Sequence, residues 1–224
     1  MKRIFAIIFL FVFLMSTNIF PQFRLKIGPL TGLNFNIGTG SDLPQTITGF
    51  GFAFGAQVDM RFTPVIGMIS QIQFYDNISG GLSQTGNIPF GQNGIVEQVI
   101  PGTLNTDFSV AYFMIEPLLK MNIPASGFYF LVGPAIGFNI QGSYSQSFSA
   151  QGGGQSQKLG TGTLQNTNVR FAVKAGAGYD IPVSNLLTLT PQFTFGYGIT
   201  TIQSDVSSRI MSFQLAAIAK FRLI

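Results

Sequence analysis

Residues 50–62 read FGFAFGAQVDMRF, and the character of the side chain changes at every position. The even-numbered positions are mainly large and apolar, namely Phe50, Phe52, Phe54, Ala56, Val58, Met60 and Phe62. The odd-numbered positions hold the small or polar residues Gly51, Ala53, Gly55, Gln57, Asp59 and Arg61. Successive side chains of a β-strand point to opposite faces, so the stretch predicts a strand with one apolar face. An ordinary strand has about 5–6 residues and a tilted membrane-spanning strand about 9–11, so its length indicates a transmembrane strand.

The alternation recurs in eight segments, which are residues 24–37, 48–62, 65–75, 108–122, 128–140, 169–181, 186–199 and 208–223. In 65–75 the sequence does not show which face is outward. The connections alternate between short and long, as in outer-membrane barrels, whose turns are short in the periplasm and long outside. We therefore predict an all-β fold, an eight-stranded antiparallel up-and-down transmembrane β-barrel of the cell outer membrane. Residues 76–107 are expected to form a long external loop, and 141–168 either a mobile loop or an extension of the sheet.

The composition argues against a water-soluble protein. Only 9% of the residues are charged and 46% are hydrophobic, whereas soluble domains have roughly 25% charged residues. A soluble lipid-carrying barrel with its apolar face inward is the alternative. The polar face is rich in glycine, which suits the narrow interior of an eight-stranded barrel better than a solvated surface. We therefore predict that the apolar face contacts outer-membrane lipid.

The N-terminus resembles a secretory signal. Lys2 and Arg3 precede an uninterrupted apolar run from Ile4 to Met15, which is shorter than the ~20 residues that a membrane-spanning helix needs. We predict a signal peptide over residues 1–21 and a barrel domain over 22–224, with an uncleaved anchor as the alternative. The formal charge of +4 includes Lys2 and Arg3, and no basic cluster supports binding to nucleic acid.

Strand parity also assigns the charges. Seven fall in connections or at their edges, namely Asp42, Asp76, Glu97, Asp107, Lys158, Asp205 and Arg209. Eleven share the small, polar face and are predicted to form a charge network in the lumen, namely Arg24, Lys26, Asp59, Arg61, Glu116, Lys120, Arg170, Lys174, Asp180, Lys220 and Arg222. Because a confined interior disfavours unpaired charge, we expect lateral ion pairs around Asp59, Glu116 and Asp180. This mostly basic set is either a structural plug or a constriction that selects anions, and the narrow interior favours the plug.

Four stretches carry a family resemblance. YFMIEPLLK (112–120), FLVGPAIG (130–137), AGAGYDIP (175–182) and the amphipathic segment 213–221 resemble strands of the PorT-like outer-membrane β-barrel family, a porin-family group of the Bacteroidetes type. The resemblance implies an eight-stranded outer-membrane barrel, and one member type belongs to a protein-secretion apparatus. Phe221 and Leu223 have the spacing of an assembly signal, so insertion by the barrel-assembly machinery is expected.

The residue inventory restricts the chemistry. Without His or Cys, the chain cannot form a Ser–His pair, a Cys nucleophile or a His/Cys metal site. The carboxylates of the connections lack the spacing of a Ca²⁺ loop. We expect no enzymatic activity, cofactor or metal. A structural or interaction role with the lumen largely plugged by side chains is predicted. A small passive pore for small solutes, or a component of a secretion or envelope complex, are the alternatives.

Overall fold

The structure is a computed structural model that describes residues 23–223 apart from 42, 44, 93–94, 153–155, 165–166 and 203–207. The side chains of 89–98 are not described either. The predicted signal peptide, residues 1–21, lies outside the described residues. No helix within the described part is long and apolar enough to cross a membrane.

The described chain is built from antiparallel strands. Their bounds are β1 Arg24–Thr39, β2 Ile47–Arg61, β3 Ile66–Gln92, β4 Ile95–Asn122, β5 Phe128–Ala150, β6 Gln157–Thr163, β7 Arg170–Tyr179, β8 Ile181–Pro182, β9 Leu187–Gly198 and β10 Arg209–Arg222. The short β8 continues β7 past Asp180, because both pair with β9. The strand β6 pairs with β5 alone and stands outside the ring.

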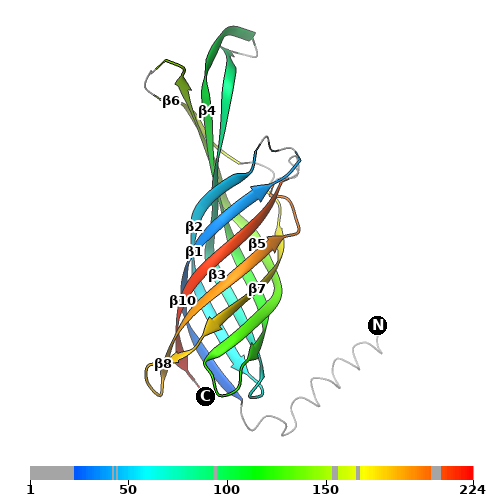
Figure 1. Cartoon of the computed structure of the whole chain (residues 1–224), viewed down its shortest axis with the longest axis vertical. Helices are drawn as coiled ribbons and strands as arrows, with labels where there is room; N and C mark the ends of the chain where they lie inside the picture. The colour runs from blue at the N-terminus through cyan, green and yellow to red at the C-terminus, as the bar shows by residue number, and fades with distance from the viewer. Residues whose placement is uncertain are drawn as a thin grey trace, which may run out of the picture.

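The remaining strands close into a barrel. Each pairs with its neighbour in the order β1–β2–β3–β4–β5–β7–β9–β10, and β10 pairs with β1 from Lys26↔Arg222 to Thr39↔Arg209. Figure 1 shows this ring of tilted strands, with the C-terminus at the end opposite the tall β3–β4 hairpin. The prediction of an eight-stranded antiparallel up-and-down barrel is therefore confirmed.

The outward face of the barrel is apolar. Large apolar side chains point away from the interior on every strand of the ring; Phe50 is 77% and Leu33 68% exposed. In segment 65–75 the structure resolves the facing, because Gly67, Ile69, Gln71 and Gln73 are buried. An apolar outer band around a polar interior is the arrangement of a transmembrane outer-membrane barrel, so the outward face contacts lipid.

A row of phenylalanines crosses four neighbouring strands on this outer face. Phe195, Phe213, Phe35 and Phe50 occupy matching register positions, and the ring centroids of successive members lie 5.1, 6.5 and 5.1 Å apart. Barrels of the outer membrane carry aromatic girdles of this kind where the lipid meets water. The row therefore lies in the external part of the apolar band, which continues to Tyr197 and Ile199.

The expectation that residues 76–107 form a loop is wrong. The strands β3 and β4 continue through this segment as one long hairpin, and β5 and β6 extend the sheet on the other side of β4. Polar pairs support these polar strands: Ser83 Oγ donates to Asn105 Oδ1 at 2.6 Å, and the hydroxyls of Thr85 and Thr103 lie 3.0 Å apart. For 141–168 the alternative of a sheet extension is confirmed.

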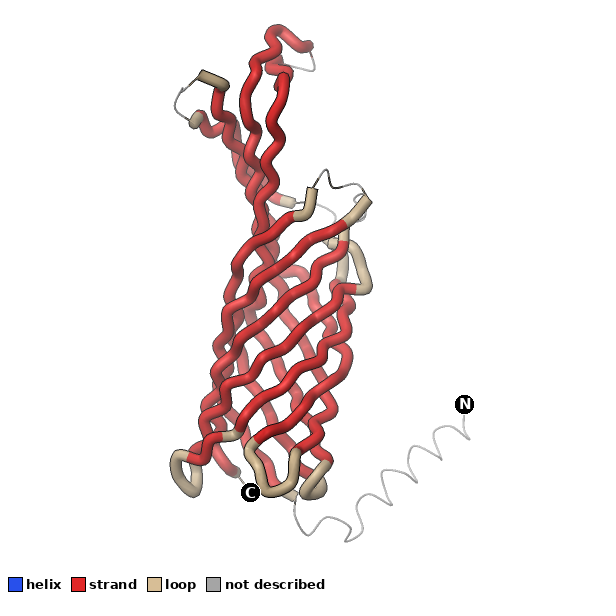
Figure 2. The backbone as a smooth tube through the Cα atoms, viewed as in Figure 1, coloured by secondary structure: helices blue, strands red, loops and turns tan. Residues whose placement is uncertain are grey.

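These extensions rise above the barrel as two prongs, as Figure 2 shows. We call them the external blade, which comprises residues 82–92 of β3, 95–106 of β4, 141–150 of β5 and the strand β6. The external blade lies at the end of the barrel that carries the long connections, which is the external end in barrels of this class.

The lipid-facing assignment predicts a difference between two leucine-to-arginine substitutions. Leu215 is 60% exposed at the middle of β10, whereas Leu186 is 66% exposed in the turn before β9. Leu215→Arg is expected to lower the free energy of unfolding from vesicles by about 2–4 kcal/mol, and Leu186→Arg by about 0–1 kcal/mol. Urea titration of the heat-modifiable gel band measures both, and equal losses would contradict the assignment.

Candidate functional site

The periplasmic end of the lumen contains a four-charge cluster made of Asp59, Lys120, Asp180 and Lys220. Lys120 Nζ lies 2.7 Å from Asp59 Oδ2 and 3.2 Å from Asp180 Oδ2. Lys220 Nζ lies 2.8 Å from Asp59 Oδ2 and 2.5 Å from Asp180 Oδ1. Thr190 Oγ1 also donates to Asp180 Oδ1 at 2.7 Å. Each lysine thus bridges both carboxylates, so no charge of the cluster is left without an opposite partner.

The aromatic ring of Tyr129 packs against the two lysines of this cluster. Its ring centroid is 4.1 Å from Lys120 Nζ and 5.4 Å from Lys220 Nζ, which adds cation–π attraction to the ion pairs. The hydroxyl of Tyr129 donates to Gln192 Oε1 at 3.0 Å. A Cβ atom at Gly178 would collide with the Tyr129 ring, so glycine on the paired strand makes room for the aromatic side chain.

A second polar layer crosses the lumen further toward the outside. Lys174 Nζ lies 2.5 Å from Glu116 Oε1, and Gln73 Nε2 donates to the same oxygen at 3.0 Å. Gln73 also contacts Gln214, whose Nε2 donates to Asn34 Oδ1 at 2.9 Å. The layer therefore connects β7, β4, β3, β10 and β1 through side chains. Glu116 is fully buried, and its Oε1 pairs with Lys174 while its Oε2 has no hydrogen-bond partner in the protein.

A third layer contains Asp76, which the sequence analysis placed in an external loop. Asp76 is buried; Asn34 Nδ2 donates to its Oδ1 at 2.5 Å, and Arg170 Nη1 lies 3.3 Å from its Oδ2. Arg170 Nη2 also donates to Ser212 Oγ at 3.2 Å. Asp76 is therefore the lumen residue that strand parity missed.

A β-bulge explains why parity failed there. The register between β3 and β4 shifts between Gln73 and Asp76. Both of these residues are buried, whereas Phe74 and Tyr75 between them are not. A bulge adds one residue to one strand, which inverts the facing of everything beyond it. Two consecutive aromatic residues in an otherwise alternating segment were the available signal.

The predicted lumen residues divide into two groups. Seven form buried or partly buried ion pairs, namely Asp59, Glu116, Lys120, Arg170, Lys174, Asp180 and Lys220. The other four lie toward the periplasmic rim. Lys26 Nζ donates to Thr188 Oγ1 at 2.9 Å, Arg61 donates to the backbone carbonyls of Thr63 and Pro64, and Arg24 and Arg222 are exposed.

The addition of Asp76 changes the charge balance of the paired set. The four acids Asp59, Asp76, Glu116 and Asp180 are matched by the four bases Lys120, Arg170, Lys174 and Lys220. The paired set is therefore neutral, and the basic excess of the predicted lumen residues lies at the periplasmic rim. A charge-neutral interior offers an anion no net attraction.

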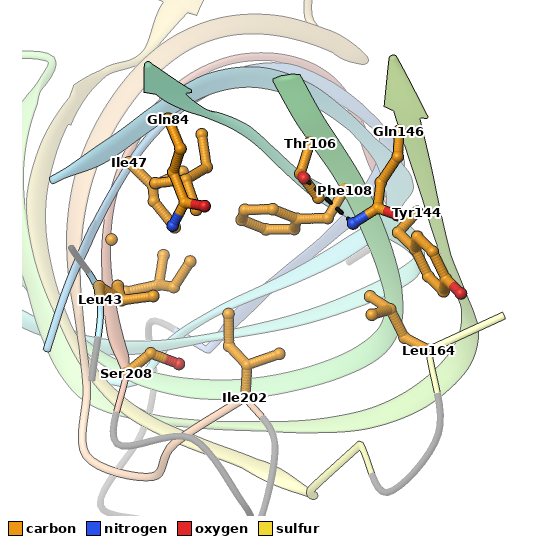
Figure 3. Close-up of a pocket in the computed structure, with 13 residues that line it drawn as sticks. Leu43, Ile47, Gln84, Thr106, Phe108, Tyr144, Gln146, Leu164, Ile202 and Ser208 are labelled. Carbon is orange, nitrogen blue, oxygen red and sulfur yellow. Dashed lines mark hydrogen bonds between the residues drawn. The ribbon is translucent and has the colours of Figure 1, made fainter. Parts of the chain in front are cut away.

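Apolar side chains also fill the interior around the third layer and on its external side. Ile78, Val110, Tyr112, Met114, Ala135, Ala172 and Ile210 form one buried cluster across the lumen. A cavity of about 430 Å³ lies on the external side of this cluster, at the mouth of the barrel (Figure 3). The sequence analysis did not predict it, because its lining comes from strand ends and connections that meet only when the ring closes.

The described residues include no group of three or more His, Cys, Asp or Glu that could hold a metal ion. The four-charge cluster has only two carboxylates, and both are occupied by lysines. Its arrangement suits side-chain packing rather than acid–base chemistry, because neither carboxylate is free to accept a proton from a substrate.

Comparison with known proteins gives similar folds at low identity. No protein-family model matches the chain, and no curated protein sequence does. Solved structures with a similar fold include Ail, the attachment invasion locus protein of Yersinia pestis, at 12% identity and a TM-score of 0.41, with 88% of this chain and 98% of that chain covered. Neisserial surface protein A (NspA) has 12% identity, a TM-score of 0.39 and coverage of 88% and 97%. The outer membrane protein OprG from Pseudomonas aeruginosa has 7% identity and a TM-score of 0.38, with 89% of this chain and 95% of that chain covered.

These scores are too low to transfer a function, and the fold assignment depends on the strand pairing of this chain itself. The resemblance to the PorT-like family stays a prediction.

The four-charge cluster predicts strong coupling between its members. Lys220→Met leaves two buried carboxylates with one cation, so it is expected to lower the free energy of unfolding by about 3–5 kcal/mol. Lys220→Met combined with Asp180→Asn removes one charge of each sign and should restore about 0.5–3 kcal/mol of that loss. Urea unfolding from vesicles measures both.

The matched control is Arg209→Met, because Arg209 is an exposed cation at the other end of the same strand. Its expected effect is within about 0.5 kcal/mol. A loss at Lys220 no larger than at Arg209 would show that the cluster contributes no stability.

Proposed function

We propose that this protein is an outer-membrane barrel with a structural or interaction role, in which side chains plug the lumen and the external blade contacts a partner. The plug is supported by side chains that contact one another across the lumen at successive levels along the barrel axis. These levels are the four-charge cluster, the layer of Glu116 and Lys174, the pair of Asp76 and Arg170, and the apolar cluster beneath the mouth.

The energetics of the ion pairs support this proposal. A solute that passes the lumen would have to separate buried ion pairs, and leaving one such charge unpaired costs about 3–5 kcal/mol. The interior of an eight-stranded barrel is just wide enough for side chains. Conduction would therefore require the pairs to rearrange together.

The blade supports the interaction role. Beyond Gly81 the strand β3 pairs with β4 alone, and β6 pairs with β5 alone, so within the described residues each has one edge without a neighbouring strand. An open edge presents backbone donors and acceptors that can pair with an extended segment of another protein. The partner class that fits is a protein with an extended, polar segment outside the cell.

A small passive pore is the second candidate. Buried polar atoms without a hydrogen-bond partner in the protein favour it, including both side-chain polar atoms of Asn36, the hydroxyl of Tyr112 and Oε2 of Glu116. Buried polar atoms of this kind are usually satisfied by water, and a connected file of water could carry small solutes. The plug is preferred because ion pairs and the apolar cluster cross the lumen at successive levels.

Three further expectations belong to the proposal. Assembly by the barrel-assembly machinery follows from the terminal residues Phe221 and Leu223. A partner in an envelope or secretion complex, contacted through the periplasmic turns, follows from the PorT-like resemblance. The absence of enzymatic activity follows from the residue inventory.

Planar-bilayer recording tests the plug. The wild-type protein is expected to give no steady single-channel currents. The double variant Glu116→Ala with Lys174→Ala removes one buried pair without leaving a lone charge, and it is expected to stay silent as well, because the four-charge cluster, the pair of Asp76 and Arg170 and the apolar cluster still close the lumen. Steady currents from the wild type would overturn the plug.

Truncation of the blade tests the interaction role. Thr85 and Thr103 face each other, so replacing Gly86–Gly102 by Asn-Gly closes a two-residue hairpin without disturbing the barrel. The truncated protein is expected to keep its heat-modifiable mobility but to lose the proteins that copurify with the wild type from native envelopes. Retention of every copurifying protein would refute a role for the hairpin tip.

A further inference from the structure

The cavity at the external mouth is lined by residues from distant parts of the chain. Gly38 lies next to the last residue of β1, and Ile47 is the first residue of β2. Phe108 comes from β4 and Ile210 from β10. Leu43 and Ile202 come from connections. Its volume of about 430 Å³ falls in the range of small-molecule sites, which occur preferentially in places that include the mouths of β-barrels.

The wall and floor of the cavity are apolar. Leu43, Ile47, Phe108, Leu164 and Ile202 supply much of the lining, and none of the described lining residues is charged. Phe108, Leu164 and Ile202 also pack against the apolar cluster below, so the floor is formed by the external end of the plug. The cavity is therefore a blind pocket on the side that faces away from the cell.

Five lining residues have polar side chains, namely Gln84, Thr106, Tyr144, Gln146 and Ser208, and three of these share one side of the cavity. Figure 3 shows Gln84, Thr106 and Gln146 along one side of the cavity, opposite Leu164 and Ile202. Gln146 Nε2 donates to Thr106 Oγ1 at 3.4 Å, which leaves the amide with further donor and acceptor capacity. This side can hold the hydroxyl or carbonyl group of a ligand while its apolar body fills the rest.

We propose that this cavity binds a neutral, mainly apolar small molecule with one hydrogen-bonding group, supplied from outside the cell. The apolar lining favours such a ligand, because its hydrocarbon part leaves water when it enters the cavity. The uncharged lining excludes an ionised ligand, because its charge would lose water without gaining a partner. This site goes beyond the proposed function, because it depends on the mouth and not on whether the lumen below conducts.

Methyl NMR of the protein in lipid nanodiscs tests the ligand class with 1-octanol and octanoate as probes. 1-Octanol is expected to shift the methyl signals of Ile47, Leu164 and Ile202 saturably, and octanoate to bind at least roughly tenfold more weakly. The methyls of Leu33 and Leu215 face lipid and report partition into the bilayer. Equal affinities for the two probes, or no saturable shift of the cavity methyls, would overturn the proposal.

Two variants test the location. A Cβ atom at Gly38 would meet Ile47 and Ile210 at ordinary contact distances, so Gly38→Phe can fill the cavity and should abolish octanol binding. Gly86→Phe is the control, because a Cβ atom there meets nothing within 4 Å and the residue lies on the blade. Gln84→Lys adds a cation to the polar side and is expected to reverse the preference toward octanoate. Unchanged octanol binding in a folded Gly38→Phe protein would contradict the site.

A third arm separates an external ligand from a lipid chain. Nanodiscs that contain lipid with a nitroxide on its acyl chain are expected to broaden the signals of Leu33 and Leu215 and to leave Ile202 sharp. Broadening of Ile202 would place a lipid chain in the cavity and would overturn supply from outside. These measurements are independent of conductance, so failure of the plug and failure of the binding site are distinguishable.

Discussion

The backbone pairing of β10 with β1 is the constraint on which the interior depends. It joins residues from the two ends of the barrel domain, and it brings Lys220 within reach of Asp59. Closure also removes the two free edges that an open sheet would expose to lipid, where unpaired backbone groups cost several kcal/mol each. Because the ring has only eight strands, every inward side chain must fit a narrow space, which explains why large groups such as Tyr129 lie over glycines such as Gly178.

Much of the barrel could be predicted from residue alternation alone, because lipid on one face and a narrow interior on the other impose opposite demands at each step. Parity also placed Asp59, Glu116, Lys120 and Lys220 on the face where the structure brings them together. The partners could not be predicted, since pairs such as Lys220 and Asp59 depend on strand tilt and closure. Asp76 was missed because the predicted strand ended at residue 75, at a bulge beyond which the facing is inverted. The β3–β4 part of the blade was missed because polar and apolar residues do not alternate regularly in residues 82–106, so no strand signal is present there.

The interior changes character along the barrel axis. Ion pairs and amide hydrogen bonds extend from the periplasmic end to the pair of Asp76 and Arg170, and apolar side chains close the external part, with the cavity above them. The order is physically coherent, because each buried charge has an opposite charge nearby and the apolar cluster separates these pairs from external water. A consequence is that the two mouths differ: the periplasmic rim carries exposed arginines such as Arg24 and Arg222, whereas the external mouth has an uncharged lining.

The bulge at Phe74–Tyr75 sets a rule for how the length of β3 can change during evolution. Loss of one residue there would turn the rest of the strand by one face, so that Asp76 would point toward lipid and Arg170 would lose its carboxylate. Single-residue insertions and deletions within this strand are therefore costly, while changes of two residues keep the facing. Length variation in related proteins should then accumulate in even steps within the strands and freely at the tip of the hairpin.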